Sequence, residues 1–227
     1  MFKISLLTVG LLLAATVVSP AQVTFTEYPV PTGASAPYGI TTGPDGNLWF
    51  AEYAGNKIAK ITTAGAITEF LVPTSGGNPT SVAAGLDGTI WFTEFDGNKI
   101  GRITPTGVIT EFPIPTVNSQ PQTITRGPDG NLWFTELDGN KIGVITPAGV
   151  ITEFPTSRPF GIVAGPDGNV WFTEGLSHKI GVITPAGVIT EFPVAGNPAG
   201  ITAGPDGNLC GSQIPLTTRL GGSLRAG

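Results

Sequence analysis

The chain has 227 residues, of which 12% are charged, and its formal net charge is −5 at pH 7. This length is ample for a buried core. The acidic balance, without any basic run, argues against nucleic acid or an anionic membrane surface as a partner. The 33 glycines and 21 prolines recur in register with turns, so they mark turns and not disorder. With Cys210 as the one cysteine, no disulfide can form within the chain.

The first 21 residues differ from everything that follows. Lys3 precedes an uncharged run over residues 4–18, and Ser19-Pro20-Ala21 comes next. This pattern is typical of a secretory signal peptide cleaved after Ala21, and the run is short for a membrane span. A retained N-terminal anchor is the alternative. We therefore expect a secreted or periplasmic protein that contacts no membrane beyond its signal peptide.

The rest of the chain is built from copies of one unit. Residues 127–152 read GPDGNLWFTELDGNKIGVITPAGVIT, and edited versions begin at Gly43, Gly85 and Gly165, with the opening residues again at Gly204. The tryptophans recur about 40 residues apart, which is the length of a supersecondary repeat. In the first copy, β-type runs over 39–42, 48–53, 57–62 and 66–72 are separated by Pro, Gly and Asn turn chemistry. Each copy therefore predicts four antiparallel strands.

Stacking of these sheets predicts the fold class. Trp49 points to one face of its strand, and Leu48 and Phe50 point to the other, so both faces need cover. Repeated four-stranded sheets of this length favour an all-β propeller, whereas a parallel β-helix needs shorter coils and a sandwich does not repeat its sequence. We expect four complete blades at about 37–74, 79–116, 121–156 and 159–194, and a partial fifth at 198–209 within the repeat region 22–209.

Both ends of the repeat array are irregular. Residues 22–30 match the fourth strand of a blade, and we expect this lone outer strand to complete the last blade so that the chain ends clasp. Cys210 replaces the expected tryptophan, and 210–227 carries no repeat motif. A frameshift or truncated reading is one hypothesis, testable in the downstream DNA, and a divergent cap is the other. Four blades leave two open apolar faces, which predicts self-association or a smaller ring.

Several charged residues recur once per blade. The glutamates that end the second strands are candidate metal ligands, although a role in the blade's own hydrogen bonding is favoured for a repeated residue: Glu52, Glu94, Glu136 and Glu174. Glutamates on the outermost strands are expected to be exposed edge charges, and the lysines that open the third strands to be solvated: Glu69, Glu111, Glu153 and Glu191; Lys57, Lys99, Lys141 and Lys179. The Asp of each Pro-Asp-Gly and the lone His178 are assigned to turns.

Residues that differ between copies are better candidates for function than residues that repeat. After the proline that opens each first strand, the side chain changes from copy to copy: Tyr38, Thr80, Gln122, Phe160 and Ala199. First strands line the centre of a propeller, so these positions are candidate channel-facing binding residues. No catalytic residue is assigned, because no nucleophile–base pair, phosphate loop or Cys/His metal spacing is present.

The repeated GPDGNLWFTE, NKIGxIT and ITEF motifs, with the preceding Pro-x-Gly-Ile, resemble the streptogramin lyase (virginiamycin B lyase) family over about 25–209. The resemblance implies a seven-bladed ring and a magnesium-dependent elimination that opens type B streptogramins at their ester. It also implies histidines at the x of Pro-x-Gly, fourteen residues before a glutamate as Tyr38 precedes Glu52. Here no matching position holds a histidine, and only the glutamates are kept. A gluconolactonase-like propeller, which needs a calcium cage of unlike ligands, fits less well.

Three functions follow from this comparison. The favoured one is a secreted scaffold that binds a small molecule or a surface partner without catalysis, since the fold is present and the base is not. The alternatives are a magnesium-dependent lyase, which requires histidines elsewhere, and a nonfunctional fragment.

Overall fold

The computed structural model describes residues 26–214 and 223–225, and side chains up to residue 212. The predicted signal peptide lies outside these residues. Nineteen strands account for the regular structure of the described part, and no helix in it is long and apolar enough to cross a membrane.

The strands form five antiparallel sheets in chain order. The first sheet contains β1 (Pro37–Thr42), β2 (Leu48–Glu52), β3 (Lys57–Ile61) and β4 (Ile67–Leu71). The second contains β5 (Pro79–Ala84), β6 (Ile90–Glu94), β7 (Lys99–Ile103) and β8 (Ile109–Pro113). The third contains β9 (Pro121–Arg126), β10 (Leu132–Glu136), β11 (Lys141–Ile145) and β12 (Ile151–Pro155). The fourth contains β13 (Ile162–Ala164), β14 (Val170–Glu174), β15 (Lys179–Ile183) and β16 (Ile189–Pro193).

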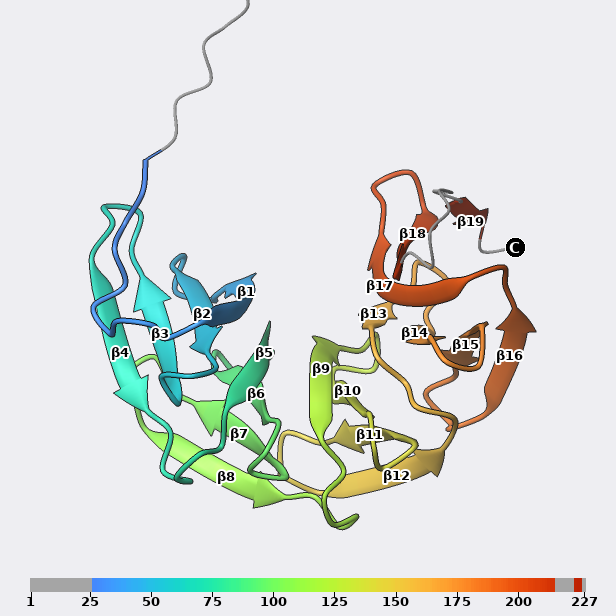
Figure 1. The fold of residues 1–227 in the computed structure, drawn as a ribbon, viewed down its shortest axis with the longest axis horizontal. Coiled ribbons are helices and arrows are strands. Elements are labelled where there is room, and N and C mark those ends of the chain that lie inside the picture. Colours follow the sequence, from blue (N-terminus) through green and yellow to red (C-terminus); the bar gives the residue numbers. More distant parts are fainter. Residues whose placement is uncertain (1–25, 215–222, 226–227) are drawn as a thin grey trace, which may run out of the picture.

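A fifth sheet of three strands follows, made of β17 (Asn197–Ala203), β18 (Asn208–Ile214) and β19 (Ser223–Arg225). Strand β18 thus continues beyond Leu209, where the repeat identity ends. The sheets stand side by side as blades of an arc, with β1, β5, β9, β13 and β17 innermost and β4, β8, β12 and β16 outermost (Figure 1). This arrangement confirms the predicted all-β propeller architecture of four-stranded antiparallel blades.

Each seam between blades is an apolar core to which both neighbouring blades contribute side chains. Between the second and third blades, Trp91 and Ile100 pack against Leu132 and Phe134. The same roles recur at the first seam with Trp49 and Phe92, and at the third with Trp133 and Phe172. All these aromatic rings are at most 1% exposed. The alternation of a strand therefore sends tryptophan to the next blade and phenylalanine to the previous one.

Phenylalanine fits in its seam because the residue paired with it on the third strand of the same blade is glycine, which has no side chain. A Cβ at Gly143 would overlap the Phe134 ring, and Gly101 and Gly181 stand in the same relation to Phe92 and Phe172. The first blade has Ala59 at this position, paired with Phe50. The glycine of NKIG therefore makes room for an aromatic ring.

The segment before β1 takes the place of an outer strand without pairing in a sheet. A Cβ at Gly65 would overlap the Tyr28 ring, just as Phe70 lies on Gly107 one blade later. Thr32 donates from its backbone nitrogen to Glu69 Oε1 at 2.8 Å, as Thr74 does to Glu111. Residues 26–30 are nevertheless not a strand in the structure, so the expected fourth-strand conformation is wrong for them, and 22–25 lie outside the described residues.

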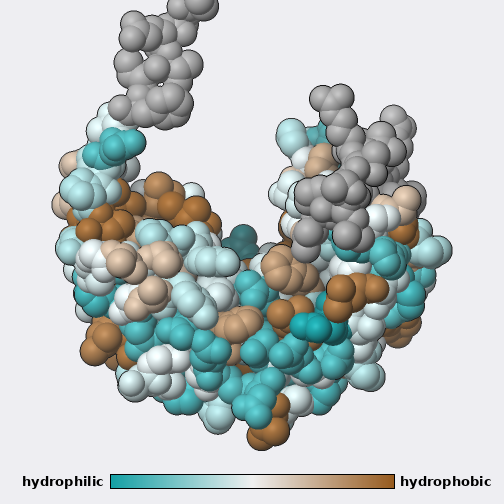
Figure 2. Space-filling view, viewed as in Figure 1, coloured by the Kyte–Doolittle hydropathy of each residue, from teal (hydrophilic) through white to brown (hydrophobic). Residues whose placement is uncertain are grey.

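The first blade has one uncovered face. Ile40 is 60% exposed and Leu48 is 43% exposed, whereas Val82 and Ile90, at the same positions of the second blade, are 7% and 1% exposed. Figure 2 shows apolar residues gathered at this end of the arc. The face that the other blades bury against a neighbour is open here within the described residues.

We predict that Gly143→Ala destabilises the protein by about 1–3 kcal/mol, because the added methyl overpacks the seam against Phe134. Chemical denaturation followed by tryptophan fluorescence measures the effect. Val188→Ala, at a side chain that is 61% exposed, is the control and should leave the midpoint nearly unchanged. Equal midpoints for Gly143→Ala and the wild type would show that the ring has other space.

Candidate functional site

The blades present two opposite rims. The start rim is the edge at which the innermost strands begin and the second strands end, where Pro37 pairs with Glu52 and Pro121 with Glu136. The turn rim is the other edge, formed by the Pro-Asp-Gly turns. The variable residues of Pro-x-Gly lie on the start rim, at bulges that shift the register between Pro37 and Ile40 and between Pro79 and Val82. Such bulges re-aim side chains beside functional sites.

Threonine in the WFTE motif fixes the backbone of this rim. The Thr135 hydroxyl accepts from Thr123 N at 3.1 Å in its own blade and donates to Phe160 O at 3.0 Å in the next. Thr173 does the same, donating to Ala199 O at 2.6 Å. Each hydroxyl therefore ties the bulge of one blade to the first strand of its neighbour.

The four predicted binding residues have different surroundings. Tyr38 is 62% exposed, whereas Thr80 is 4% exposed and donates to Gln122 O at 2.8 Å within the seam. Gln122 and Phe160 are half-buried. Of the four side chains, Tyr38 is the one that the structure presents openly to solvent.

Tyr38 belongs to an aromatic row on the start rim. Its ring centroid lies 5.9 Å from that of Tyr53, which lies 6.5 Å from that of Phe95. The Tyr53 hydroxyl donates to Asp96 at 3.3 Å. Tyr53 and Phe95 were not among the binding residues predicted from the sequence. A signal was available, since the position after the WFTE glutamate also varies between copies: Tyr53, Phe95, Leu137 and Gly175.

The second-strand glutamates lie beneath the same rim and are fully buried, each at 0% exposure. Neither carboxyl oxygen of Glu52, Glu94 or Glu136 has a hydrogen-bond partner within the described residues. The turn backbone packs directly on them: a Cβ at Gly97 would lie 2.7 Å from Glu94 Oε2, and one at Gly139 would lie 2.8 Å from Glu136 Oε2. These carboxyls therefore cannot touch a ligand on the rim.

The outer glutamates and the lysines form ion pairs, so the predicted solvation of the lysines is wrong, and so is the predicted exposure of Glu69, Glu111 and Glu153. Glu191 is exposed as predicted. Lys99 Nζ lies 2.6 Å from Glu111 Oε2, and the Glu111 side chain is 15% exposed. The Thr74 hydroxyl, from the preceding linker, donates to the same carboxylate at 2.9 Å. Equivalent networks recur in two other blades: Lys57, Glu69 and Thr32; Lys141, Glu153 and Thr116. Each network fastens a linker to the next blade.

The fourth blade breaks this pattern because its linker is shorter. Here Thr156 donates to Glu174 Oε1 and not to the outer glutamate, and Ser157 N donates to the same oxygen at 2.9 Å. Lys179 keeps Glu191 as its partner. A shorter linker thus supplies the buried glutamate with donors that the other blades lack.

Burial changes the protonation of the unpartnered glutamates. Loss of solvation raises the pKa of Glu94 to about 7, helped by the negative charge of Glu111 and opposed by Lys99. The pKa of Glu136 rises to about 8 by the same causes, with Glu153 and Lys141 as the neighbouring charges. Burial also raises the pKa of Glu52. Each of these glutamates therefore favours its neutral form more than a solvated carboxyl does.

The described residues do not fit the magnesium ion that the resemblance implies. Mg²⁺ requires converging oxygen ligands, but each second-strand glutamate is enclosed in its own blade, beside a lysine in three of them. No three His, Cys, Asp or Glu side chains are placed to hold a metal among the residues that the structure describes.

The remaining polar candidates have local roles. His178 is exposed with a φ of 54°, as predicted for a turn, and its Nδ1 lies 2.8 Å from Gly196 O. Asp129 accepts hydrogen bonds from Asn131 N at 3.2 Å and Trp133 Nε1 at 3.1 Å. The Asp of Pro-Asp-Gly thus anchors both its turn and the indole of the next strand.

Comparison with known proteins gives a consistent result. The model of the virginiamycin B lyase family matches residues 19–214. A virginiamycin B lyase of Bacillus licheniformis is 48% identical over 46 residues, which are 20% of this chain and 16% of that protein. A catalytically inactive virginiamycin B lyase from Staphylococcus aureus, solved with quinupristin, is 47% identical with a TM-score of 0.78, over 82% of this chain and 66% of that one.

The selenomethionine form of the Staphylococcus aureus enzyme is 41% identical with a TM-score of 0.83, over 88% of this chain and 73% of that one. Against the quinupristin structure, this chain therefore spans slightly less than two thirds of the relative's length.

The buried glutamates predict a specific pH dependence. The unfolded carboxyl ionises near 4.5 and folded Glu136 near 8, so between these values the folded state holds a proton that the unfolded state has lost. As far as this group is concerned, the free energy of unfolding is highest below pH 4.5 and decreases by about 1.4 kcal/mol per pH unit up to the folded pKa. As the pH rises from 5 to 8, the free energy of unfolding should therefore decrease less in Glu136→Gln than in the wild type.

Urea denaturation at pH 5, 6.5 and 8 tests this prediction. Glu27→Gln, at an exposed carboxyl, is the matched control and should follow the wild type across the range. If Glu136→Gln also follows it, the carboxyl of Glu136 is ionised in the folded protein and the prediction is wrong.

Proposed function

Because this chain belongs to the virginiamycin B lyase family, we propose that it is an exported propeller that binds a streptogramin-type macrocycle on its start rim without opening the ring. The export part rests on the signal-peptide pattern of residues 1–21. The binding part rests on the relative from Staphylococcus aureus that was solved with quinupristin.

The aromatic row carries this proposal. Tyr38, Tyr53 and Phe95 line the start rim, and Tyr38 is 62% exposed. Large rigid rings with a polar tip are effective anchors for amphipathic ligands, because they contribute apolar area at low entropy cost. Cyclic depsipeptides combine an apolar body with amide and ester dipoles, which this row can match.

The binding role is favoured over ring opening by the surroundings of the potential bases. An elimination needs a group that removes a proton from the substrate. In Glu94 and Glu136 the raised pKa suits a base near neutral pH, but both side chains are 0% exposed and covered by turns. His178, the lone histidine, lies in an exposed turn after Glu174 and contacts Gly196. Beside the aromatic row, the exposed Asp96 accepts hydrogen bonds from Tyr53 and Asn78, and no histidine lies there within the described residues.

Titration calorimetry with quinupristin tests the proposal. We expect saturable binding by the wild type, and binding about tenfold weaker for Tyr38→Ala, since interface tyrosines carry a large share of binding energy. Val188→Ala, at an exposed apolar side chain away from the rim, is the matched control and should bind as the wild type does. Absence of binding, or equal binding by Tyr38→Ala, would contradict the proposal.

Incubation with quinupristin and Mg²⁺ tests the lyase alternative. Opening the ring by elimination adds no atoms, so chromatographic retention and fragment ions report it where the intact mass does not. We expect the ligand to be recovered intact. A linear product that depends on the protein would establish a lyase.

A further inference from the structure

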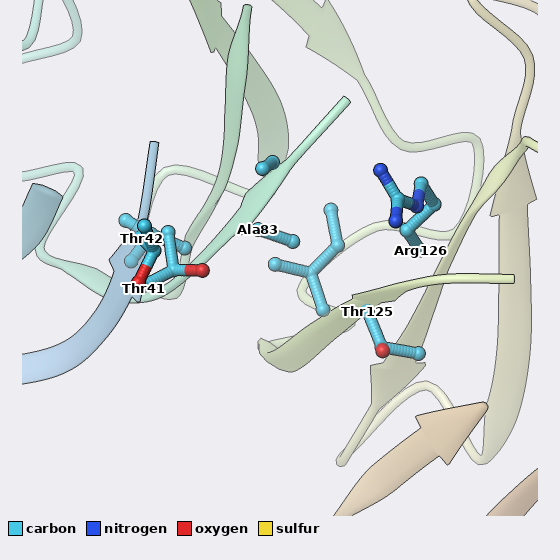
Figure 3. A pocket seen from close by; sticks show the side chains of 8 residues that line it. Thr41, Thr42, Ala83, Thr125 and Arg126 are labelled. Carbon is cyan, nitrogen blue, oxygen red and sulfur yellow. The ribbon is translucent and has the colours of Figure 1, made fainter. Parts of the chain in front are cut away.

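A pocket of about 360 Å³ lies on the turn rim, opposite the aromatic row. It lies where β1, β5 and β9 end, and Figure 3 shows Thr41, Ala83 and Arg126 reaching it from these three strands. Val82, Ala84 and Ile124 supply its apolar lining, and Thr125 adds a hydroxyl. The size falls within the range of small-molecule sites.

Arg126 differs from every other cation between residues 26 and 212. The others each have a carboxylate within 4.0 Å: Lys57, Lys60, Lys99, Arg102, Lys141, Arg158 and Lys179. Arg126 is exposed and has no ion pair or side-chain hydrogen bond within the part of the chain that the structure describes. The fold thus leaves one guanidinium available at the pocket.

Arg126 also breaks the repeat. The last residue of the other innermost strands is small, being threonine or alanine: Thr42, Ala84, Ala164 and Ala203. Because Ile124 and Arg126 alternate onto the face of β9 that looks toward the second blade, the cation projects over that seam alone. A blade does not need it, since the other blades are built without it.

The surroundings select the charge of a ligand. Asp45 and Asp87, in turns of the same rim, lie 3.8 Å from Lys60 and 4.0 Å from Arg102, and Asp129 is held by Asn131 and Trp133. These aspartates already have partners, which leaves Arg126 unpaired, and its one positive charge is balanced by a ligand with one negative charge. A single carboxylate matches the planar guanidinium fork with two hydrogen bonds.

We propose that this pocket binds a small organic monocarboxylate, with the carboxylate on Arg126 and the apolar body over Ala83 and Ile124, which lie on the same seam as Arg126. This site is separate from the macrocycle site of the start rim. It requires no residue of the aromatic row.

Titration calorimetry and amide NMR shifts with acetate, hexanoate and benzoate test the proposal, with hexanamide and benzamide as neutral partners of equal shape. We expect saturable binding of at least one apolar carboxylate, with shifts in β5 and β9, and binding at least about tenfold weaker for its amide and for Arg126→Gln. Arg126→Lys, which keeps the charge without the fork, should fall between the two.

Arg158→Gln is the matched control, because Arg158 is also exposed but is paired with Asp138 at 2.9 Å. It should bind the carboxylate as the wild type does. Quinupristin binding should be unchanged in Arg126→Gln, so the two sites are judged separately. The proposal is overturned if none of the three carboxylates binds saturably, or if Arg126→Gln binds with wild-type affinity.

Discussion

The structure depends on burying both faces of each sheet against its neighbours. Trp91 fills a seam on one side of the second blade and Phe92 fills a seam on the other. Apolar burial contributes about 25 cal/mol per Å², so about 40 Å² of buried apolar surface matches one typical net hydrogen bond of about 1 kcal/mol. The contrast between buried Ile90 and half-exposed Leu48 shows that the same sequence position depends on the neighbouring blade for its cover.

Hydrogen bonds and ion pairs fix the bulges and linkers of blades that apolar burial has stacked together. Thr135 ties one bulge to the next blade, and the network of Lys99, Glu111 and Thr74 fastens a linker to the following blade. Where the linker shortens, Thr156 turns to Glu174 while the seam of the third and fourth blades keeps its aromatic pair. Hydrogen bonding therefore adapts to linker length, and the apolar seam does not.

The strands and blade order could be predicted from sequence because turns and alternation are local properties. The ion pairs could not, since Thr74 reaches Glu111 from 37 residues away and nothing local links them. The exposed Tyr38 and the buried Thr80 occupy equivalent positions. Their difference depends on the adjoining blade, which a single repeat does not encode. Tyr53, Phe95 and Arg126 differ from the residues at the same positions of the other repeats, so the sequence could have identified them. Their places on the two rims are known only from the bulges and strand ends of the structure.

Function in a repeat protein must come from residues that the scaffold does not use. The repeated Trp, Phe and Thr residues hold seams and turns together, and the repeated Lys–Glu pairs fasten linkers. Replacing one of them therefore lowers the stability of the fold before it changes binding. Residues free of such duties occur at the strand ends, because a strand's middle is covered on both faces while its ends meet solvent. Tyr38 on one rim and Arg126 on the other satisfy this condition. Two separate rims on one rigid core can therefore diverge independently, since a change at either leaves the seams intact.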